Sequence, residues 1–130
     1  MDVLIEMLMK PLQYRRVEEV RTRDGRAFVI DVSYQLNRMY EPWKLDLSTG
    51  IYIGSKGRGL LVVEEKESGE RVSMRFNVHE EFEPVPGTLM GIIRIRASLS
   101  LDYFCKDLQR KFGEDVAREL RAYLKRLLPL

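Results

Sequence analysis

Several residue types are scarce in this chain, and each scarcity excludes a class of protein. A single cysteine, Cys105, excludes an internal disulfide and fits a reducing compartment, so we expect a cytoplasmic protein. No apolar run approaches the ~18 residues that a membrane-spanning helix needs. The N-terminal MDVLIEMLMK lacks the basic leader and small-residue cleavage site of a secretion signal. Asparagine and glutamine are few while arginine and glutamate abound, a balance typical of thermophile proteins.

The chain also lacks a large excess of one charge. Its 22 basic and 20 acidic side chains leave a net charge of +2, less than a dedicated nucleic-acid binder usually carries. Duplex DNA is therefore not an expected partner at physiological salt. With 130 residues, 45% of them hydrophobic, the chain is long and apolar enough to form one folded domain, residues 1–130.

What the chain does contain is repeated alternation of apolar and polar residues, which predicts strands. Residues 12–23 are ambiguous, because they fit either a short helix or a strand that runs into the Asp24-Gly25 turn. Since one face of each strand is polar, the pattern indicates an antiparallel sheet of about six or seven strands with one buried face. The expected strands are residues 3–10, 27–36, 43–48, 51–53, 60–66, 72–79 and 93–99.

The C-terminal region supplies a cover for the apolar face of this sheet. Ser100 is a candidate N-cap, and apolar residues recur every three or four positions from Phe104 to Leu127. Gly113, followed by two acidic residues, is also typical of a helix end and a new first turn. Because the apolar stripe keeps its phase through Gly113, we predict one continuous, bent helix. The predicted fold class is α+β, an antiparallel, curved, one-face-buried sheet covered by a long C-terminal amphipathic helix.

The segment GIYIGSKGRGLLVV, residues 50–63, is the most function-like stretch of the chain. It packs four glycines around Lys56 and Arg58, as a phosphate-binding loop would. A P-loop requires a different spacing and a following helix, whereas residues 60–63 continue as a strand. We therefore predict a glycine-rich turn between two strands, and keep an anion contact by Lys56 and Arg58 as the alternative.

No combination of side chains indicates catalysis, so we expect a protein that is not an enzyme and uses no cofactor. His79 is the only histidine and lacks the partners of a metal site, which predicts a solvated strand end and no bound metal. Cys105 lies near the apolar stripe without a neighbouring base, which predicts a structural thiol. No carboxylate pair has a spacing typical of acid–base chemistry.

Four arginines form a candidate basic stripe on the outer face of the sheet. Carboxylates on neighbouring strands would neutralise such a stripe by cross-strand pairing, which predicts a solvated, paired face. The alternative is contact with a nucleic acid or a protein partner. The four arginines are Arg71, Arg75, Arg94 and Arg96, and the expected acidic partners are Glu64, Glu65 and Asp46.

The order of elements, and above all the segment PVPGTLMGIIRIRASLSLDYFCKDLQRKFGEDVARELRAYLKRLLPL, residues 84–130, resembles the START and Bet v 1-like helix-grip superfamily. The resemblance implies a curved sheet that wraps the helix around an apolar pocket, in which members bind lipids, sterols or other hydrophobic molecules. A fold-level likeness does not determine function. We nevertheless predict non-catalytic binding of a hydrophobic small molecule or lipid between the sheet and the C-terminal helix.

Aromatic and aliphatic residues on the inward stripes are the candidate ligand-binding residues for such a pocket, and plain core packing is the other interpretation of them. The alternative function is an interaction module that binds nucleic acid or a protein through its basic faces. The candidate ligand-binding residues are Tyr34, Trp43, Phe76, Phe104, Leu108 and Phe112.

Overall fold

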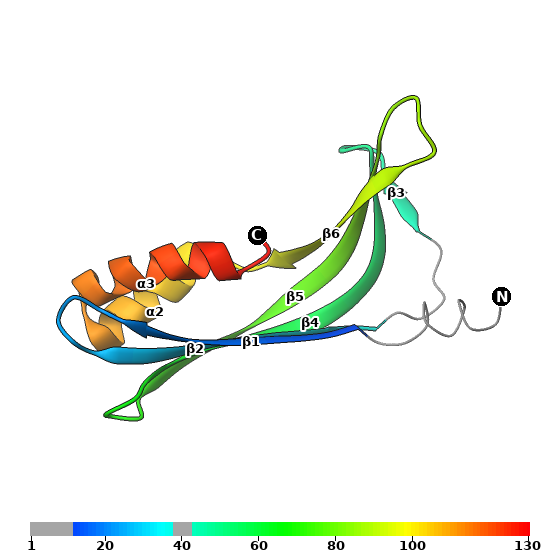
Figure 1. Cartoon of the computed structure of the whole chain (residues 1–130). Coiled ribbons are helices and arrows are strands. Elements are labelled where there is room, and N and C mark those ends of the chain that lie inside the picture. The colour runs from blue at the N-terminus through cyan, green and yellow to red at the C-terminus, as the bar shows by residue number, and fades with distance from the viewer. Residues whose placement is uncertain (1–11, 38–42) are drawn as a thin grey trace.

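The computed structural model describes residues 12–37 and 43–130. Figure 1 shows a curled antiparallel sheet, a half-barrel in outline, with two C-terminal helices stacked against one end of its concave face. The predicted strand at residues 3–10 lies outside the described residues. In chain order the elements are β1 (Leu12–Arg21), β2 (Ala27–Leu36), β3 (Lys44–Asp46), β4 (Ile51–Glu65), β5 (Arg71–Pro84), β6 (Gly91–Ser98), α2 (Leu101–Phe112) and α3 (Glu114–Leu127).

The sheet has the strand order β1-β2-β4-β5-β6, and β3 pairs with the outer end of β4. Neighbouring strands are antiparallel, as the alternation of polar and apolar residues predicted. The ambiguous residues 12–23 form a strand: β1 pairs with β2 from Leu12 opposite Leu36 to Arg21 opposite Ala27. The turn between them contains Gly25 at a φ of 87°, a conformation that glycine adopts without steric cost.

The core lies between the concave face of the sheet and the two helices. In β2 every second side chain from Phe28 to Val32 is buried, while the intervening residues are partly exposed. The helices add their apolar stripes from the other side, so the α+β class with one buried sheet face is confirmed. The buried helical residues are Leu101, Phe104, Leu108 and Phe112 on α2, with Val116, Ala117, Leu120 and Leu124 on α3.

The prediction of one continuous helix is wrong, because Gly113 separates α2 from α3. Gly113 has a φ of 97° and a ψ of 164°, far from helical values. The two helices run in opposite directions, so that Arg121 in the middle of α3 pairs at 2.5 Å with Asp102 at the start of α2. The apolar residues keep the same spacing on both sides of Gly113 because α2 and α3 both pack against the same sheet (Figure 1).

Arg26 ties the reversal at Gly113 to the sheet. Its guanidinium donates a hydrogen bond to the Phe112 carbonyl oxygen at 2.9 Å, satisfying one of the carbonyls left free at the end of α2. It also pairs at 2.6 Å with Glu65, a largely buried carboxylate. The sequence alternative of a helix end at Gly113 is therefore the correct one, and Ser100 caps α2 as predicted.

A Gly113→Ala variant is expected to be less stable by about 1–3 kcal/mol, because an L side chain is strained at this positive φ. Open space surrounds the position where the Cβ would lie, so backbone strain alone causes the loss. Thermal unfolding of the variant measures it. Ala117→Gly, in the first turn of α3, is the matched control. A higher melting temperature for Gly113→Ala than for the wild-type protein would contradict the observed break between the helices.

The glycine-rich segment is a strand, so the prediction of a turn is wrong, while the alternative of an anion contact by Lys56 and Arg58 stays a prediction. Residues 51–65 form one continuous strand, β4. Its register with β5 shifts between Ile53 and Lys56, where one extra residue forms a β-bulge opposite Glu80. A bulge bends and twists the strand that carries it, and Figure 1 shows β4 curving away from the helices beyond this region.

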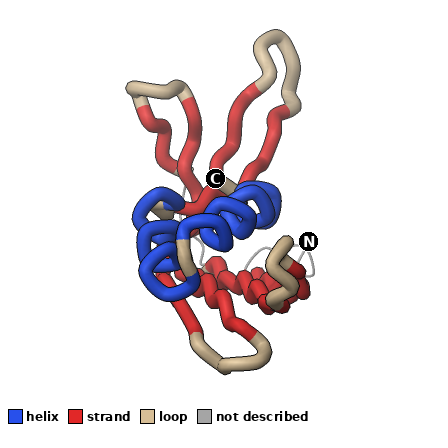
Figure 2. The backbone as a smooth tube through the Cα atoms, turned by 90° about the vertical axis from the view of Figure 1, so that its left-hand side faces the viewer, coloured by secondary structure: helices blue, strands red, loops and turns tan. Residues whose placement is uncertain are grey.

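Beyond the bulge the strands project past the helices as an arm, which comprises β3, residues 51–55, residues 80–84 and residues 91–95. Figure 2 shows two hairpin ends extending from the helical part of the molecule, separate from the hairpin at the opposite end. On β5 burial falls along this direction, from buried Phe76 and Val78 to partly exposed Phe82 on the same face. The helices thus cover only part of the concave face.

Candidate functional site

The inner face of the arm carries an apolar surface, here called the aromatic platform, formed by Trp43, Tyr52, Phe82 and Ile93. Tyr52 and Ile93 lie directly opposite Phe82 on its two neighbouring strands, so the three side chains share one face. The Phe82 ring packs at 6.2 Å between centroids against Trp43 and against Tyr52, in an edge-to-face and a tilted arrangement. These geometries are favourable for aromatic pairs and hold the rings in place.

Two glycines let the platform rings lie flat against the sheet. A Cβ at Gly54 would lie 2.5 Å from Trp43 Cζ3, and a Cβ at Gly91 would overlap the Phe82 ring. Any other residue at either position would lift the ring that covers it. The glycine at the bulge is therefore explained by close approach of an aromatic side chain, a role that glycine has in strands.

The platform borders a hollow of about 390 Å³ that stays open on one side. Trp43 is 42% exposed and Ile93 61% exposed, large fractions for such apolar side chains. The volume lies within the range of small-molecule sites, which are mostly apolar with few polar groups. An apolar molecule on these rings would remove both its own surface and theirs from water.

The predicted ligand-binding residues separate into three places. Trp43 lies on the platform, whereas Tyr34 stacks on Tyr14 with ring centroids 4.8 Å apart. The remaining four are part of the core beneath the helices: Phe76, Phe104, Leu108 and Phe112. Sequence reasoning missed three platform residues, namely Tyr52, Phe82 and Ile93. The available signal was the alternation of β5, which was predicted to end at residue 79 but continues to Pro84. Extending that period-two pattern places Phe82 on the same face as Phe76 and Val78.

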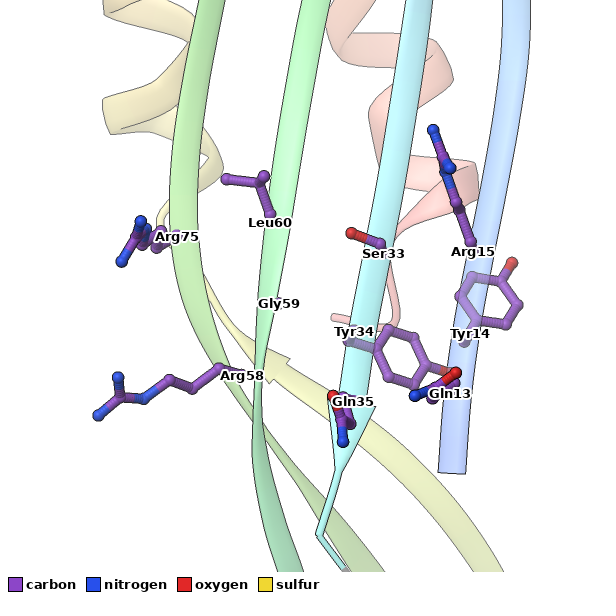
Figure 3. A pocket seen from close by; sticks show the side chains of 10 residues that line it. All are labelled: Gln13, Tyr14, Arg15, Ser33, Tyr34, Gln35, Arg58, Gly59, Leu60 and Arg75. Carbon is purple, nitrogen blue, oxygen red and sulfur yellow. The ribbon is translucent and has the colours of Figure 1, made fainter. Parts of the chain in front are cut away.

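The outward face of the sheet carries a second hollow, here called the cationic groove. It has a volume of about 590 Å³ and runs across β1, β2, β4 and β5. Figure 3 shows Arg58 and Arg75 extending in the same direction from adjacent strands, with Arg15 at the opposite edge. A further polar hollow, lined by Lys56 and Asn77, shares Arg58 with it. The groove is lined by Gln13, Tyr14, Arg15, Ser33, Tyr34, Gln35, Arg58, Gly59, Leu60 and Arg75.

Most of the predicted basic stripe is neutralised, though by partly different carboxylates. Arg71 pairs with Glu64 as expected, at 3.3 Å. Glu65 instead pairs with Arg26, and Asp46 accepts hydrogen bonds from Ser48 in the turn before β4. The other two paired arginines use residues that the sequence did not suggest: Arg94 pairs with Glu83 at 2.7 Å, and Arg96 pairs with Glu81 at 3.0 Å.

His79 and Cys105 occupy structural positions. His79 Nε2 lies 2.8 Å from Glu81 Oε1, so its ring is held by a carboxylate, whereas a solvated strand end was predicted. Burial alone would raise the pKa of Glu81, but hydrogen bonds from His79 and Arg96 outweigh it and lower that pKa. Burial raises the pKa of the half-buried Cys105 thiol, which disfavours the reactive thiolate.

Within residues 12–37 and 43–130, no three histidine, cysteine or acidic side chains gather closely enough to hold a metal ion. No helix in that part of the chain has the length and apolar character needed to cross a membrane. Comparisons with protein-family models, with curated proteins and with solved structures found no match to this chain. The site must therefore be interpreted from its own geometry.

Proposed function

We propose that this protein binds a hydrophobic small molecule or lipid without catalysis, and that the ligand lies on the aromatic platform of the arm. The observation that carries the proposal is an apolar hollow that no described residue covers, in which Trp43 and Tyr52 both pack against the Phe82 ring. The sequence-based hypothesis placed the ligand between the sheet and the helix. Phe104 and Leu108 have no exposed surface there, so we move the proposed site to the open end of the concave face.

The platform suits a flat or chain-like apolar group. Its rings are already packed against the sheet and one another, so binding would order few side chains and would lose little entropy. Among the described residues the hollow is lined by three aromatic side chains and one isoleucine, none of them charged, so it has no partner for a charged group. A ligand with a polar head would keep that head in water beyond the rings.

The resemblance to the helix-grip superfamily is in keeping with this proposal. Members of that superfamily bind hydrophobic molecules on the concave side of a curved sheet, and this chain has such a sheet with C-terminal helices. Here the helices form a hairpin at one end, which leaves the other end of the concave face for a ligand. Fold likeness raises the expectation but does not identify the ligand.

Ile93→Glu is expected to weaken the binding of Nile red, a neutral dye with solvent-sensitive emission, by at least tenfold, or about 1.4 kcal/mol. The reason is that a bound apolar molecule would desolvate the new carboxylate, which has no cation to pair with inside the hollow. Dye titration measures the dissociation constant. Quenching of Trp43, the only tryptophan in the chain, reports independently whether the dye occupies the platform.

Val17→Glu is the matched control, because Val17 is 52% exposed on the outward face of β1. Both variants add one carboxylate at an exposed apolar strand position, so they should have similar melting temperatures. Equal dye affinity in the two variants, or binding that leaves Trp43 emission unchanged, would refute the platform as the site.

A further inference from the structure

We propose that the cationic groove on the outward face of the sheet binds single-stranded nucleic acid through its phosphate backbone. This surface lies on the opposite face from the aromatic platform and is independent of the proposed hydrophobic ligand. Among the described residues, its cations without an ion pair are Arg58 and Arg75, and Lys56 lines the adjoining polar hollow, which shares Arg58 with the groove.

Among the described residues these three cations have no partner, whereas most of the arginines around them form ion pairs. Within residues 12–37 and 43–130, Lys56, Arg58 and Arg75 take part in no ion pair and no side-chain hydrogen bond. At the margins of the same face four arginines pair with carboxylates from neighbouring strands. These marginal pairs are Arg15 with Asp31, Arg71 with Glu64, Arg94 with Glu83, and Arg96 with Glu81.

The spacing of the three cations follows from the strand register. Arg58 lies directly opposite Asn77, so Arg75 is its diagonal neighbour on β5, about 7–8 Å away between Cα atoms. Lys56 is two residues from Arg58 on the same face of β4, about 7 Å along the strand. Three like charges at this separation repel one another, and a chain of phosphates laid across them would relieve that repulsion.

The groups beside the cations fit a nucleic acid better than a membrane. Gln13, Gln35 and Asn77 offer amide donors and acceptors along the groove, as unpaired bases and sugars require. The arginine guanidinium matches phosphate oxygens by two parallel hydrogen bonds. A flat bilayer surface would not reach the floor of a hollow. A duplex keeps its base edges inside grooves that the face of a sheet does not enter, so a single strand fits best.

The proposal is consistent with the small net charge of the protein. Three phosphate contacts release about two counterions from a single strand, so binding is measurable at low salt and weak at physiological salt. Few aromatic rings are available for base stacking: Tyr14 and Tyr34 belong to the groove lining, but they stack on each other and lie on the same face as buried Phe28 and Val32, which is the concave face. Binding should therefore depend on the backbone rather than on base sequence.

Fluorescence anisotropy with a short labelled oligothymidylate tests the inference. The affinity of the wild-type protein should fall with salt with a log–log slope of about −2, from three contacts at about 0.7 each. Arg58→Gln/Arg75→Gln should weaken binding at low salt at least about tenfold and reduce the slope to about −0.7. Both side chains are exposed and have no partner among the described residues, so the melting temperature and Nile red affinity should remain unchanged.

The matched control is Arg110→Gln/Arg118→Gln, which removes the same charge from exposed positions on α2 and α3. It should retain the wild-type affinity and slope. Equal losses in the two double variants would mean diffuse charge attraction and would overturn the groove as the site. If a duplex of the same length bound more tightly than the oligothymidylate, the single-strand assignment would be overturned. Binding to phosphatidylserine vesicles without binding to the oligonucleotide would overturn it as well.

Discussion

A Phe104→Ala variant is expected to lose about 3–5 kcal/mol of unfolding free energy, the usual cost of removing a fully buried phenylalanine. Phe104 has no exposed surface and packs in the core between α2 and the sheet. Truncation removes most of an apolar side chain and leaves a cavity that neighbouring strands cannot close. Urea unfolding measures the loss as a lower midpoint with an unchanged slope.

Tyr103→Ala is the control for this experiment, because Tyr103 is adjacent on the same helix but 61% exposed. Its effect should stay within about 0.5 kcal/mol. The comparison also separates the two interpretations of the inward aromatics. If Phe104→Ala left stability unchanged and abolished Nile red binding, the space between sheet and helices would be a ligand pocket, and the platform proposal would be wrong.

Gly57→Ala is expected to destabilise the protein by about 3 kcal/mol, at the upper end of the cost of forced overpacking. A Cβ at this position would overlap the carbonyl oxygen of Gln35 and lie 2.8 Å from the Cα of Leu36, both on β2. Backbone atoms cannot move aside as a flexible side chain does, so the central β2–β4 pairing would have to separate locally. A melting temperature lower by about 10 °C would be the observable result.

Arg58→Ala, at the next residue of the same strand, is the control for Gly57→Ala. Arg58 is exposed and forms no ion pair with any described residue, so its truncation should change stability by no more than about 0.5 kcal/mol. Similar melting temperatures for Gly57→Ala and Arg58→Ala would show that β2 and β4 tolerate a side chain at this position. They would also remove the structural reason for this glycine.

The glycine-rich segment illustrates why sequence reasoning failed locally. Three of its glycines lie within a strand, and at each of them a neighbouring group occupies the space that a Cβ would need. These glycines are Gly54, Gly57 and Gly59. A tryptophan ring covers the first, the β2 backbone the second and the Phe76 ring the third. None of these neighbours is close in sequence, so composition alone favoured the commoner explanation, a turn.

The candidate sites were only partly predictable for the same reason. Trp43 was identified, but its partners Tyr52 and Phe82 join it through the pairing of β4 with β5 across a bulge. Arg75 was placed in a basic stripe, but whether an arginine is neutralised depends on which carboxylate lies diagonally opposite. The β4–β5 register leaves Arg75 diagonal to Arg58, while the β5–β6 register brings Arg96 diagonal to Glu81.

The sequence by itself determined the class of fold, the strand at residues 27–36, the Ser100 cap and the apolar stripe of the C-terminal region. These features follow from local periodicity and capping, which act over a few residues. Only the tertiary structure decided that Gly113 reverses the chain, that β4 is continuous, and that the helices leave one end of the sheet uncovered. Each of these depends on contacts between segments that are distant in sequence, such as the hydrogen bond from Arg26 to the Phe112 carbonyl oxygen. A pattern of neighbouring residues carries no information about such contacts.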